Sequence, residues 1–220
     1  MRHTHRVDRI ASTRAQHLIA LPDCDAEGAA GDVVVSFAGC AGQRCMAASV
    51  LLIVGPREGA PQRRLLREVI EKASRLAPGT GPGQMGPVID AASLEKIRGY
   101  VDGAERGGAT VLLDGRTWSA RYPDVRASGG HWIGPTVLLH EHATDAAMTE
   151  EIFGPVLSVH HVATWQEAVA IENANPFGNA AAIYTTHGGH AEWFLTRMRA
   201  AVSVSVSRRR ARFAFSSSGV

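Results

Sequence analysis

The 220-residue chain lacks the features that would place it in several specialised classes of protein. Its 23 lysines and arginines against 21 acids leave a formal net charge of only +2. No global field therefore attracts nucleic acid or anionic lipid, and we expect neither as a partner. The chain has no apolar run near the roughly 18 residues of a membrane span, and residues 1–14 lack the apolar core of a secretory signal. Its 45% hydrophobic and 20% charged residues are instead typical of a globular domain.

Cysteine is scarce as well, with Cys24, Cys40 and Cys45 as the three thiols. A small odd number argues against a disulfide framework and favours a reducing compartment, so we expect unpaired thiols and a cytoplasmic location. Before context is considered, each cysteine is more often a buried packing residue than a nucleophile, and this is what we expect of Cys40. His3 and His5 could touch a metal, but a solvated, frayed terminus is the simpler interpretation, and no metal site is predicted.

Three stretches of the chain differ in kind. Residues 1–16 form an irregular basic segment, residues 17–206 read as a folded body, and residues 207–220 form a basic, serine-rich tail. The arginines of this tail could bind nucleic acid, but a solvated tail is the simpler interpretation.

Helical and extended patterns alternate along the body. Apolar spacing predicts helices over 65–76, 94–104 and 191–199, and a capping box at Thr164 and Glu167 starts another. The predicted strands cover 109–113, 137–139, 156–162, 180–185 and 202–206. Asp90 is the expected N-cap of the second helix, while residues 31–38 fit a helix or a strand equally well. This alternation predicts an α/β domain with a largely parallel sheet.

Residues 81–86, Gly-Pro-Gly-Gln-Met-Gly, match the glycine string of dinucleotide-binding folds. That string works where a strand leads into a tight turn and a helix N-terminus then meets the pyrophosphate. Here a helix precedes the glycines, and no helical pattern follows at residues 87–89. We therefore expect a connecting loop.

The segment 36–49 carries the chemistry. Small residues surround Cys45, and Gly42 lets the backbone turn sharply and a ligand approach closely. Arg44 places a guanidinium beside the thiol, where its charge can favour the thiolate that attacks carbonyl carbon. The apolar run 50–54 follows, which predicts that Cys45 lies on a loop at the mouth of a strand.

In these residues the sequence resembles the aldehyde dehydrogenase superfamily. Residues 38–49 match its cysteine signature, and the strings at 85–89, 130–137 and 150–156 recur in the family's order and spacing. Within the superfamily, the strings at 16–23, 42–47 and 175–179 resemble the CoA-acylating branch, the methylmalonate-semialdehyde dehydrogenases. The resemblance covers roughly residues 15 to 206.

The resemblance implies a catalytic-domain fold, mostly parallel sheet with flanking helices, without the nucleotide-binding domain of the full-length members. It also implies that Cys45 captures a small aldehyde such as methylmalonate or malonate semialdehyde. Oxidation by NAD then leaves a thioester on the cysteine, and CoA, a co-substrate, removes the acyl group. The backbone N–H of Cys45 would donate to the oxyanion. Residues 10–14 contain no carboxylate where other members have the glutamate that activates water, which fits the acylating branch.

Three further residues receive roles from this resemblance. Glu151 and Phe153 match the positions that contact the nicotinamide ribose and the ring edge, and the alternative is a structural turn motif. Arg44 either anchors the carboxylate of a semialdehyde acid or pairs with a nearby acid of the protein.

The expected NAD site is incomplete, so we expect this chain alone to bind NAD weakly or not at all. A companion chain that supplies the nucleotide-binding domain would restore activity. A non-catalytic interaction module and an NAD-independent thiol esterase remain as alternatives.

Overall fold

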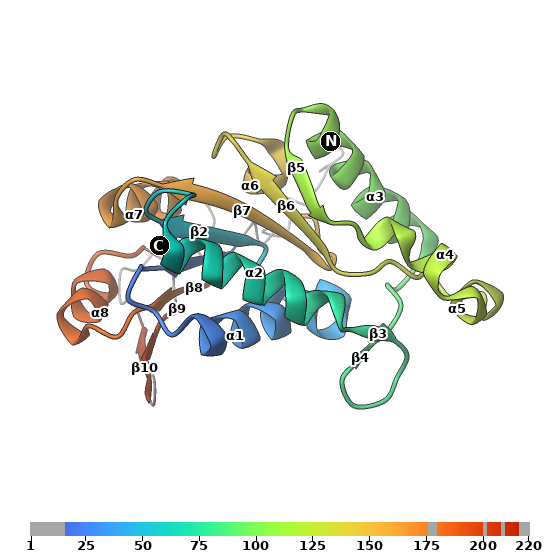
Figure 1. Cartoon of the computed structure of the whole chain (residues 1–220), viewed down its shortest axis with the longest axis horizontal. Coiled ribbons are helices and arrows are strands. Elements are labelled where there is room, and N and C mark those ends of the chain that lie inside the picture. The colour runs from blue at the N-terminus through green and yellow to red at the C-terminus, as the bar shows by residue number, and fades with distance from the viewer. Residues whose placement is uncertain (1–15, 176–179, 200–201, 208–209, 216–220) are drawn as a thin grey trace, which may run out of the picture.

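The computed structural model describes residues 16–175, 180–199, 202–207 and 210–215. A sheet of eight strands lies at its centre, in the order β10-β9-β8-β1-β2-β7-β6-β5 (Figure 1). The strands are β1 (His17–Ala20), β2 (Val50–Val54), β5 (Thr110–Leu113), β6 (Thr136–His140), β7 (Val156–Val162), β8 (Ala180–Tyr184), β9 (Val202–Ser207) and β10 (Arg210–Phe215). Only the pairs at the two edges, β5 with β6 and β10 with β9, are antiparallel in this sheet. The mostly parallel sheet confirms the predicted α/β class.

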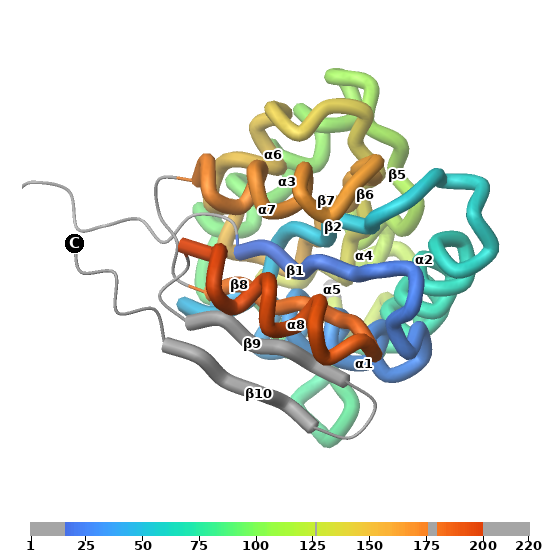
Figure 2. The backbone as a smooth tube through the Cα atoms, turned by 90° about the vertical axis from the view of Figure 1, so that its left-hand side faces the viewer, coloured from blue at the N-terminus to red at the C-terminus, as the bar shows by residue number. Residues whose placement is uncertain are grey.

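Helices cover both faces of the sheet, and Figure 2 shows α7 and α8 in front of it. The helices are α1 (Ala26–Ala38), α2 (Ala60–Ser74), α3 (Ala91–Arg106), α4 (Trp118–Arg121), α5 (Pro123–Ala127), α6 (Ala146–Thr149), α7 (Trp165–Ala174) and α8 (Gly188–Leu195). One apolar cluster joins α1, α2 and α3 to one face, and a second joins α7 and α8 to the other. Strand β2 supplies both, since Leu51 and Ile53 belong to the first cluster and Leu52 and Val54 to the second. Burial on both faces explains its continuous apolar sequence.

The predicted helix starts are confirmed by their caps. The Asp90 carboxylate accepts a hydrogen bond from the Ser93 N–H at 2.7 Å, and α3 follows. The Thr164 hydroxyl accepts from the Glu167 N–H at 3.2 Å, and the Glu167 carboxylate accepts from the Ala163 N–H at 2.9 Å. In a standard capping box the Glu167 carboxylate would accept from the N–H of the cap residue Thr164. Here it accepts from the N–H of the preceding residue, Ala163, and so still satisfies a backbone N–H at the start of α7.

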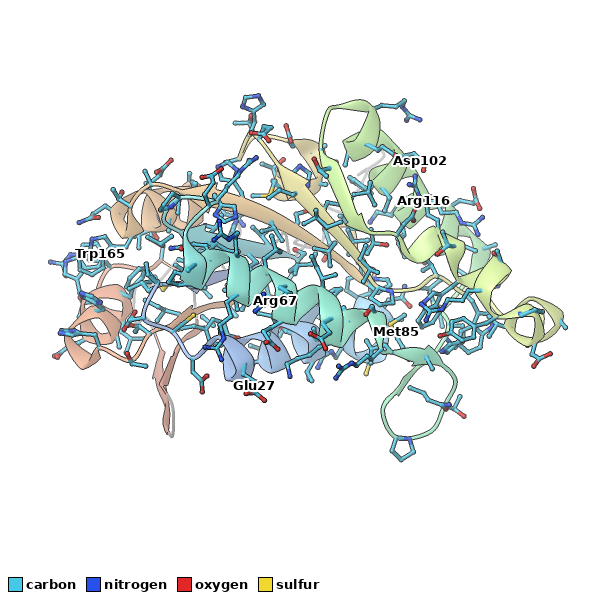
Figure 3. All side chains as sticks on the ribbon, viewed as in Figure 1. Glu27, Arg67, Met85, Asp102, Arg116 and Trp165 are labelled. Carbon is cyan, nitrogen blue, oxygen red and sulfur yellow. The ribbon has the colours of Figure 1, made fainter. Side chains whose placement is uncertain are left out.

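A charged network fixes α3 to the turn that follows β5. Arg116 donates to Asp102 and Glu105 of α3 at 2.5 and 2.8 Å and to Asp114 at 2.8 Å (Figure 3). These hydrogen bonds raise the pKa of Arg116, so the guanidinium stays charged. The network is half-exposed, which makes it a positional tie more than a large source of stability.

The structure decides one segment that the sequence left open and differs from the sequence-based expectation at other elements. Residues 31–38, which were open between helix and strand, belong to α1. The last predicted helix begins and ends earlier than 191–199, as α8. Strand β1 has only four residues and no alternation, so nothing in its own sequence predicted it. The basic tail expected to be solvated forms β10 in part, because its backbone finds β9 as an antiparallel partner.

The glycine-rich stretch 81–86 is a connecting loop, as predicted. It contains the two-residue strand β4 (Gln84–Met85), which pairs with β3 (Ala77–Pro78), and the next helix begins at Ala91. The Gly79 N–H donates to the Met85 carbonyl at 3.1 Å and closes the loop.

Some expectations lie outside the described residues. They concern His3 and His5, the stretch 10–14, and positions 176–179 of one branch string. Within the described part of the chain, no helix combines the length and apolarity that crossing a membrane requires. The cytoplasmic location stays a prediction.

Candidate active site

The predicted site residues meet at the amino ends of three neighbouring strands. Gln16 directly precedes β1, the loop 43–49 precedes β2, and the segment 151–155 precedes β7. Because these strands are parallel and adjacent, their amino ends lie side by side at the same end of the sheet. One cleft there is lined by all four predicted residues, Arg44, Cys45, Glu151 and Phe153, and by Gln16.

A left-handed stretch of backbone carries the chain out of α1 toward Cys45. Cys40 and Ala41 have φ angles of 53° and 54°, and Gly42 follows at 69°. This conformation strains residues with a Cβ atom and suits glycine. A Cβ at Gly42 would lie 2.2 Å from the Gly154 carbonyl oxygen, so the absence of a side chain lets the two loops touch.

Cys45 lies at the tip of a turn that neighbouring elements hold. The Ala47 N–H donates to the Arg44 carbonyl at 3.0 Å, which leaves Cys45 and Met46 exposed at the tip. The side-chain amide of Gln16 donates to the carbonyl of Cys45 itself. Cys45 therefore lies on a loop before a strand, as the sequence predicted.

The guanidinium of Arg44 caps the end of α1. Its Nη2 donates to the carbonyls of Val35 and Ser36 at 2.7 and 2.9 Å, and basic side chains commonly satisfy the last carbonyls of a helix in this way. Among the described residues no acid pairs with it, so that alternative is not the one observed. Its role toward a substrate carboxylate stays a prediction.

The three cysteines, all within the described residues, form no disulfide and differ in exposure. Cys45 is exposed in the cleft. The expectation that Cys40 packs in the core is wrong, because its left-handed loop carries it to the surface. Burial, together with the carboxylates of Asp23 and Asp25, raises the pKa of Cys24 to about 11, so this half-buried thiol stays protonated.

Glu151 and Phe153 stand between two hollows. On one side is the Cys45 cleft, whose volume of about 20 Å³ holds about one water molecule. On the other side is a cavity of about 240 Å³, also lined by Ser93 and Lys96 of α3. Phe153 has a φ of 57° and is 39% exposed, whereas the intervening Ile152 is buried and anchors the segment. The cleft alone is too small for an aldehyde and a nicotinamide ring.

Sequence reasoning assigned no role to Gln16, Ser93 or Lys96. Ser93 and Lys96 are three residues apart on α3 and so share a face, but nothing local in the sequence placed that face beside Glu151. Gln16 was part of a matching string, yet its contact with Cys45 joins segments far apart in the chain.

A different polar cluster lies at the opposite end of the sheet, where the carboxyl ends of β1 and β8 are. Asp23, after β1, accepts hydrogen bonds from the hydroxyl of Thr185 and from the N–H and hydroxyl of Thr186 at 2.8 Å each. Burial opposes ionisation of this carboxyl, but these bonds outweigh it and lower the pKa of Asp23. These hydrogen bonds hold the loop after β1 against the loop after β8. Across the described residues, no group of three or more His, Cys, Asp or Glu side chains is placed to hold a metal ion.

Comparisons with known proteins agree with this arrangement. The sequence profile of the aldehyde dehydrogenase family matches residues 15–213. The mitochondrial acylating methylmalonate-semialdehyde/malonate-semialdehyde dehydrogenase of Bos taurus is 35% identical over 196 residues, which are 86% of this chain and 34% of that protein. The chain thus spans about a third of the length of this curated relative.

Two solved structures share the fold. The methylmalonate-semialdehyde dehydrogenase of Oceanimonas doudoroffii superposes with a TM-score of 0.76 at 34% identity, covering 87% of this chain and 38% of that one. A putative methylmalonate-semialdehyde dehydrogenase of Sinorhizobium meliloti 1021, complexed with NAD, gives a TM-score of 0.77 at 30% identity over the same shares of the two chains. From the profile match, the sequence identity and the shared fold together, this chain belongs to the aldehyde dehydrogenase family.

Proposed function

We propose that the chain is the cysteine-bearing part of an NAD-dependent, CoA-acylating dehydrogenase for a semialdehyde acid such as methylmalonate or malonate semialdehyde. The observation that carries this proposal is the convergence of Arg44, Cys45, Glu151 and Phe153 on one cleft. The names of the bovine and Oceanimonas relatives support the substrate class. The NAD bound to the Sinorhizobium protein supports the cofactor.

The Cys45 thiolate attacks the aldehyde carbon in this proposal. A bond forms between sulfur and carbon, and the electron pair of the carbonyl π bond moves to oxygen. The backbone N–H of Cys45 donates to this oxyanion, and its value depends on being held in place before the reaction. The anchored turn 44–47 provides that rigidity.

The residues beyond Cys45 fit a nicotinamide nucleotide. The Glu151 carboxylate can accept hydrogen bonds from ribose hydroxyls, and the Phe153 ring can contact the edge of the nicotinamide. Lys96, on the wall of the 240 Å³ cavity beside them, offers a cation for a phosphate. Bound NAD would supply the oxidant that converts the thiohemiacetal to a thioester on Cys45.

Release of the acyl group needs a nucleophile. In the CoA-acylating reaction the thiol of CoA loses its proton to solvent and attacks the thioester carbon, the new sulfur–carbon bond replaces the bond to Cys45, and the thiolate of Cys45 is regenerated. Among the described residues that line the Cys45 cleft, Glu151 is the one carboxylate, and the proposal assigns it to the ribose.

Arg44 anchors the carboxylate of the substrate in this proposal. Its described hydrogen bonds all come from Nη2, which leaves Nη1 of the fork for a carboxylate oxygen. The same bonds to α1 hold the guanidinium beside Cys45.

We further propose that these 220 residues are inactive by themselves and act with a companion chain that supplies the nucleotide-binding domain. Three large apolar side chains around the Cys45 loop are exposed: Val35 (66%), Met46 (49%) and Ile89 (77%). Val35 is tied to this loop through Arg44, and the Ile89 N–H donates to the side chain of Gln43 at 2.9 Å. Contiguous exposed apolar surface commonly marks protein interfaces, and we propose that these three side chains contact the companion chain.

The test mixes the chain with NAD, CoA and methylmalonate semialdehyde and follows the absorbance of NADH. We expect none from the chain alone, and turnover when the isolated nucleotide-binding domain of a full-length relative is added. That turnover should vanish in Cys45→Ala and persist in the control Cys40→Ala. Robust turnover by the chain alone would refute the proposed inactivity.

The same variants separate the alternatives. Hydrolysis of an activated ester that is indifferent to NAD and lost in Cys45→Ala would favour a thiol esterase. Binding to a full-length relative without turnover of aldehyde or ester would favour a non-catalytic interaction module.

A further inference from the structure

We propose that Gln16 is a positioning residue for Cys45: its side-chain amide holds the carbonyl of Cys45 and so fixes the turn that presents the thiol and the oxyanion donor. This inference rests on the proposed function of Cys45. It adds a residue that touches neither the aldehyde nor NAD in that proposal.

Both the main chain and the side chain of Gln16 bind the Cys45 loop. The side-chain amide donates to the Cys45 carbonyl. The Gln16 carbonyl accepts from the N–H groups of Ser49 and Val50 at 3.3 and 3.1 Å. Gln16 therefore grips the loop at the reactive residue and again where the loop enters β2.

The position of Gln16 is itself fixed by the middle of the sheet. The next residue, His17, opposes Val50 of β2 on one side and Ala181 of β8 on the other. Since successive side chains of a strand point to opposite faces, the His17 side chain lies on the other face of the sheet. There it pairs with Glu172 of α7, and both residues are buried. The backbone of Gln16 is therefore continuous with a strand that is paired on both sides and anchored by this buried pair.

Other side-chain bonds fix residues before and after Cys45 in this loop. Arg44 is held by its bonds to α1, and the Ala48 N–H donates to the Ser36 hydroxyl at 3.1 Å. The bond from Gln16 acts on the peptide between Cys45 and Met46. Its loss lets that peptide rotate, and a misplacement of about 1 Å at a reacting group can cost about a hundredfold in rate.

The experiment compares two reactions of Cys45 in the intact chain, each followed by mass spectrometry of the modified peptide. In acylation by p-nitrophenyl acetate, sulfur attacks the ester carbon, a sulfur–carbon bond forms, the carbon–oxygen bond breaks, and p-nitrophenolate leaves while the thiol proton goes to solvent. This reaction passes through an oxyanion and depends on its donors. Alkylation by iodoacetamide displaces iodide at a saturated carbon and forms no oxyanion.

In Gln16→Ala we expect acylation of Cys45 to slow about tenfold or more, while alkylation changes less than about twofold. Gln16→Met is a second variant of similar length, and its thioether cannot donate to the carbonyl. We expect it to slow acylation as well.

Gln62→Ala is the matched control. The Gln62 amide is also buried and donates to a β2 carbonyl, that of Val54, at 2.7 Å. Val54 ends β2, far from the loop that precedes Val50, so its loss should lower stability without slowing the acylation of Cys45. The exposed Cys40 serves as an internal reference within each sample.

Each outcome decides the inference. Wild-type rates of acylation in the folded Gln16 variants overturn it and leave the proposed role of Cys45 intact. Acylation of wild-type Cys45 no faster than that of Cys40 overturns both. If neither Gln16 variant folds while Gln62→Ala does, Gln16 is a structural residue and the inference is wrong.

Discussion

Replacing Gly42 by alanine should lower the free energy of unfolding by about 3 kcal/mol. Part of this comes from the φ of 69°, since a left-handed conformation costs a residue with a Cβ about 1–2 kcal/mol. The rest comes from contact, because the new Cβ would lie 2.2 Å from the Gly154 oxygen and 2.7 Å from the Phe37 oxygen, both of backbone. Real Cβ contacts stay beyond 3.0 Å, so the two loops must separate, and overpacking of this kind costs about 1–3 kcal/mol.

Urea denaturation followed by circular dichroism measures the loss. Gly83→Ala is the control, because Gly83 has a similar φ of 73° but a Cβ there would meet nothing within 4 Å. It should lose only the conformational cost of about 1–2 kcal/mol. The excess loss in Gly42→Ala therefore measures the close packing of Gly42 against the carbonyl oxygens of Gly154 and Phe37. Equal losses in the two variants would refute the argument that this close packing holds the Cys45 loop in place.

Three further predictions concern stability and thiol reactivity. Thr164→Ala should lower the free energy of unfolding by about 1 kcal/mol, because the Thr164 hydroxyl caps α7; a urea midpoint equal to wild type would contradict the cap. Burial lowers the pKa of His140 despite its bond to Asp145, so the folded state binds this proton less tightly than the unfolded state. Its contribution to stability is present above the ordinary histidine pKa of about 6.5 and is lost as the pH falls below it, and His140→Gln should flatten the loss of stability between about pH 7.5 and pH 5; an equally steep loss in the variant would rule this out. Burial raises the pKa of Cys24 to about 11, so iodoacetamide at about pH 8 should label the exposed Cys40 well before Cys24, and equal labelling would speak against the burial of Cys24.

The elements that the sequence predicted are those whose signal is local. The amphipathic helices α2 and α3 show an apolar stripe of their own, and the cap at Thr164 needs only residues three apart. Strands β1 and β10 escaped prediction because their stability lies in their partners. A four-residue buried strand has no alternation to read, and a basic strand resembles a solvated tail until β9 is beside it.

The same distinction divides the candidate site. Local sequence placed Cys45 on a loop before a strand, since an apolar run follows it. That Glu151 and Phe153 face it follows only from the pairing of β2 with β7, which brings the two preceding loops together. Cys40 was expected in the core because cysteines are often buried, but its left-handed backbone is a property of the turn and not of the residue type.

The cleft lies in loops outside the sheet, so its geometry depends on contacts between these loops and not on strand pairing alone. Ligand sites in α/β sheets commonly lie at the carboxyl ends of the strands. Here the candidate site lies at the amino ends of the strands, and the Asp23 cluster occupies part of the carboxyl end. The loop that bears Cys45 must then be held by contacts with neighbouring loops, among them the Gly42–Gly154 approach and the Gln16 bond. The sheet can thus fold while the cleft is lost, and folding and reactivity should respond to different substitutions.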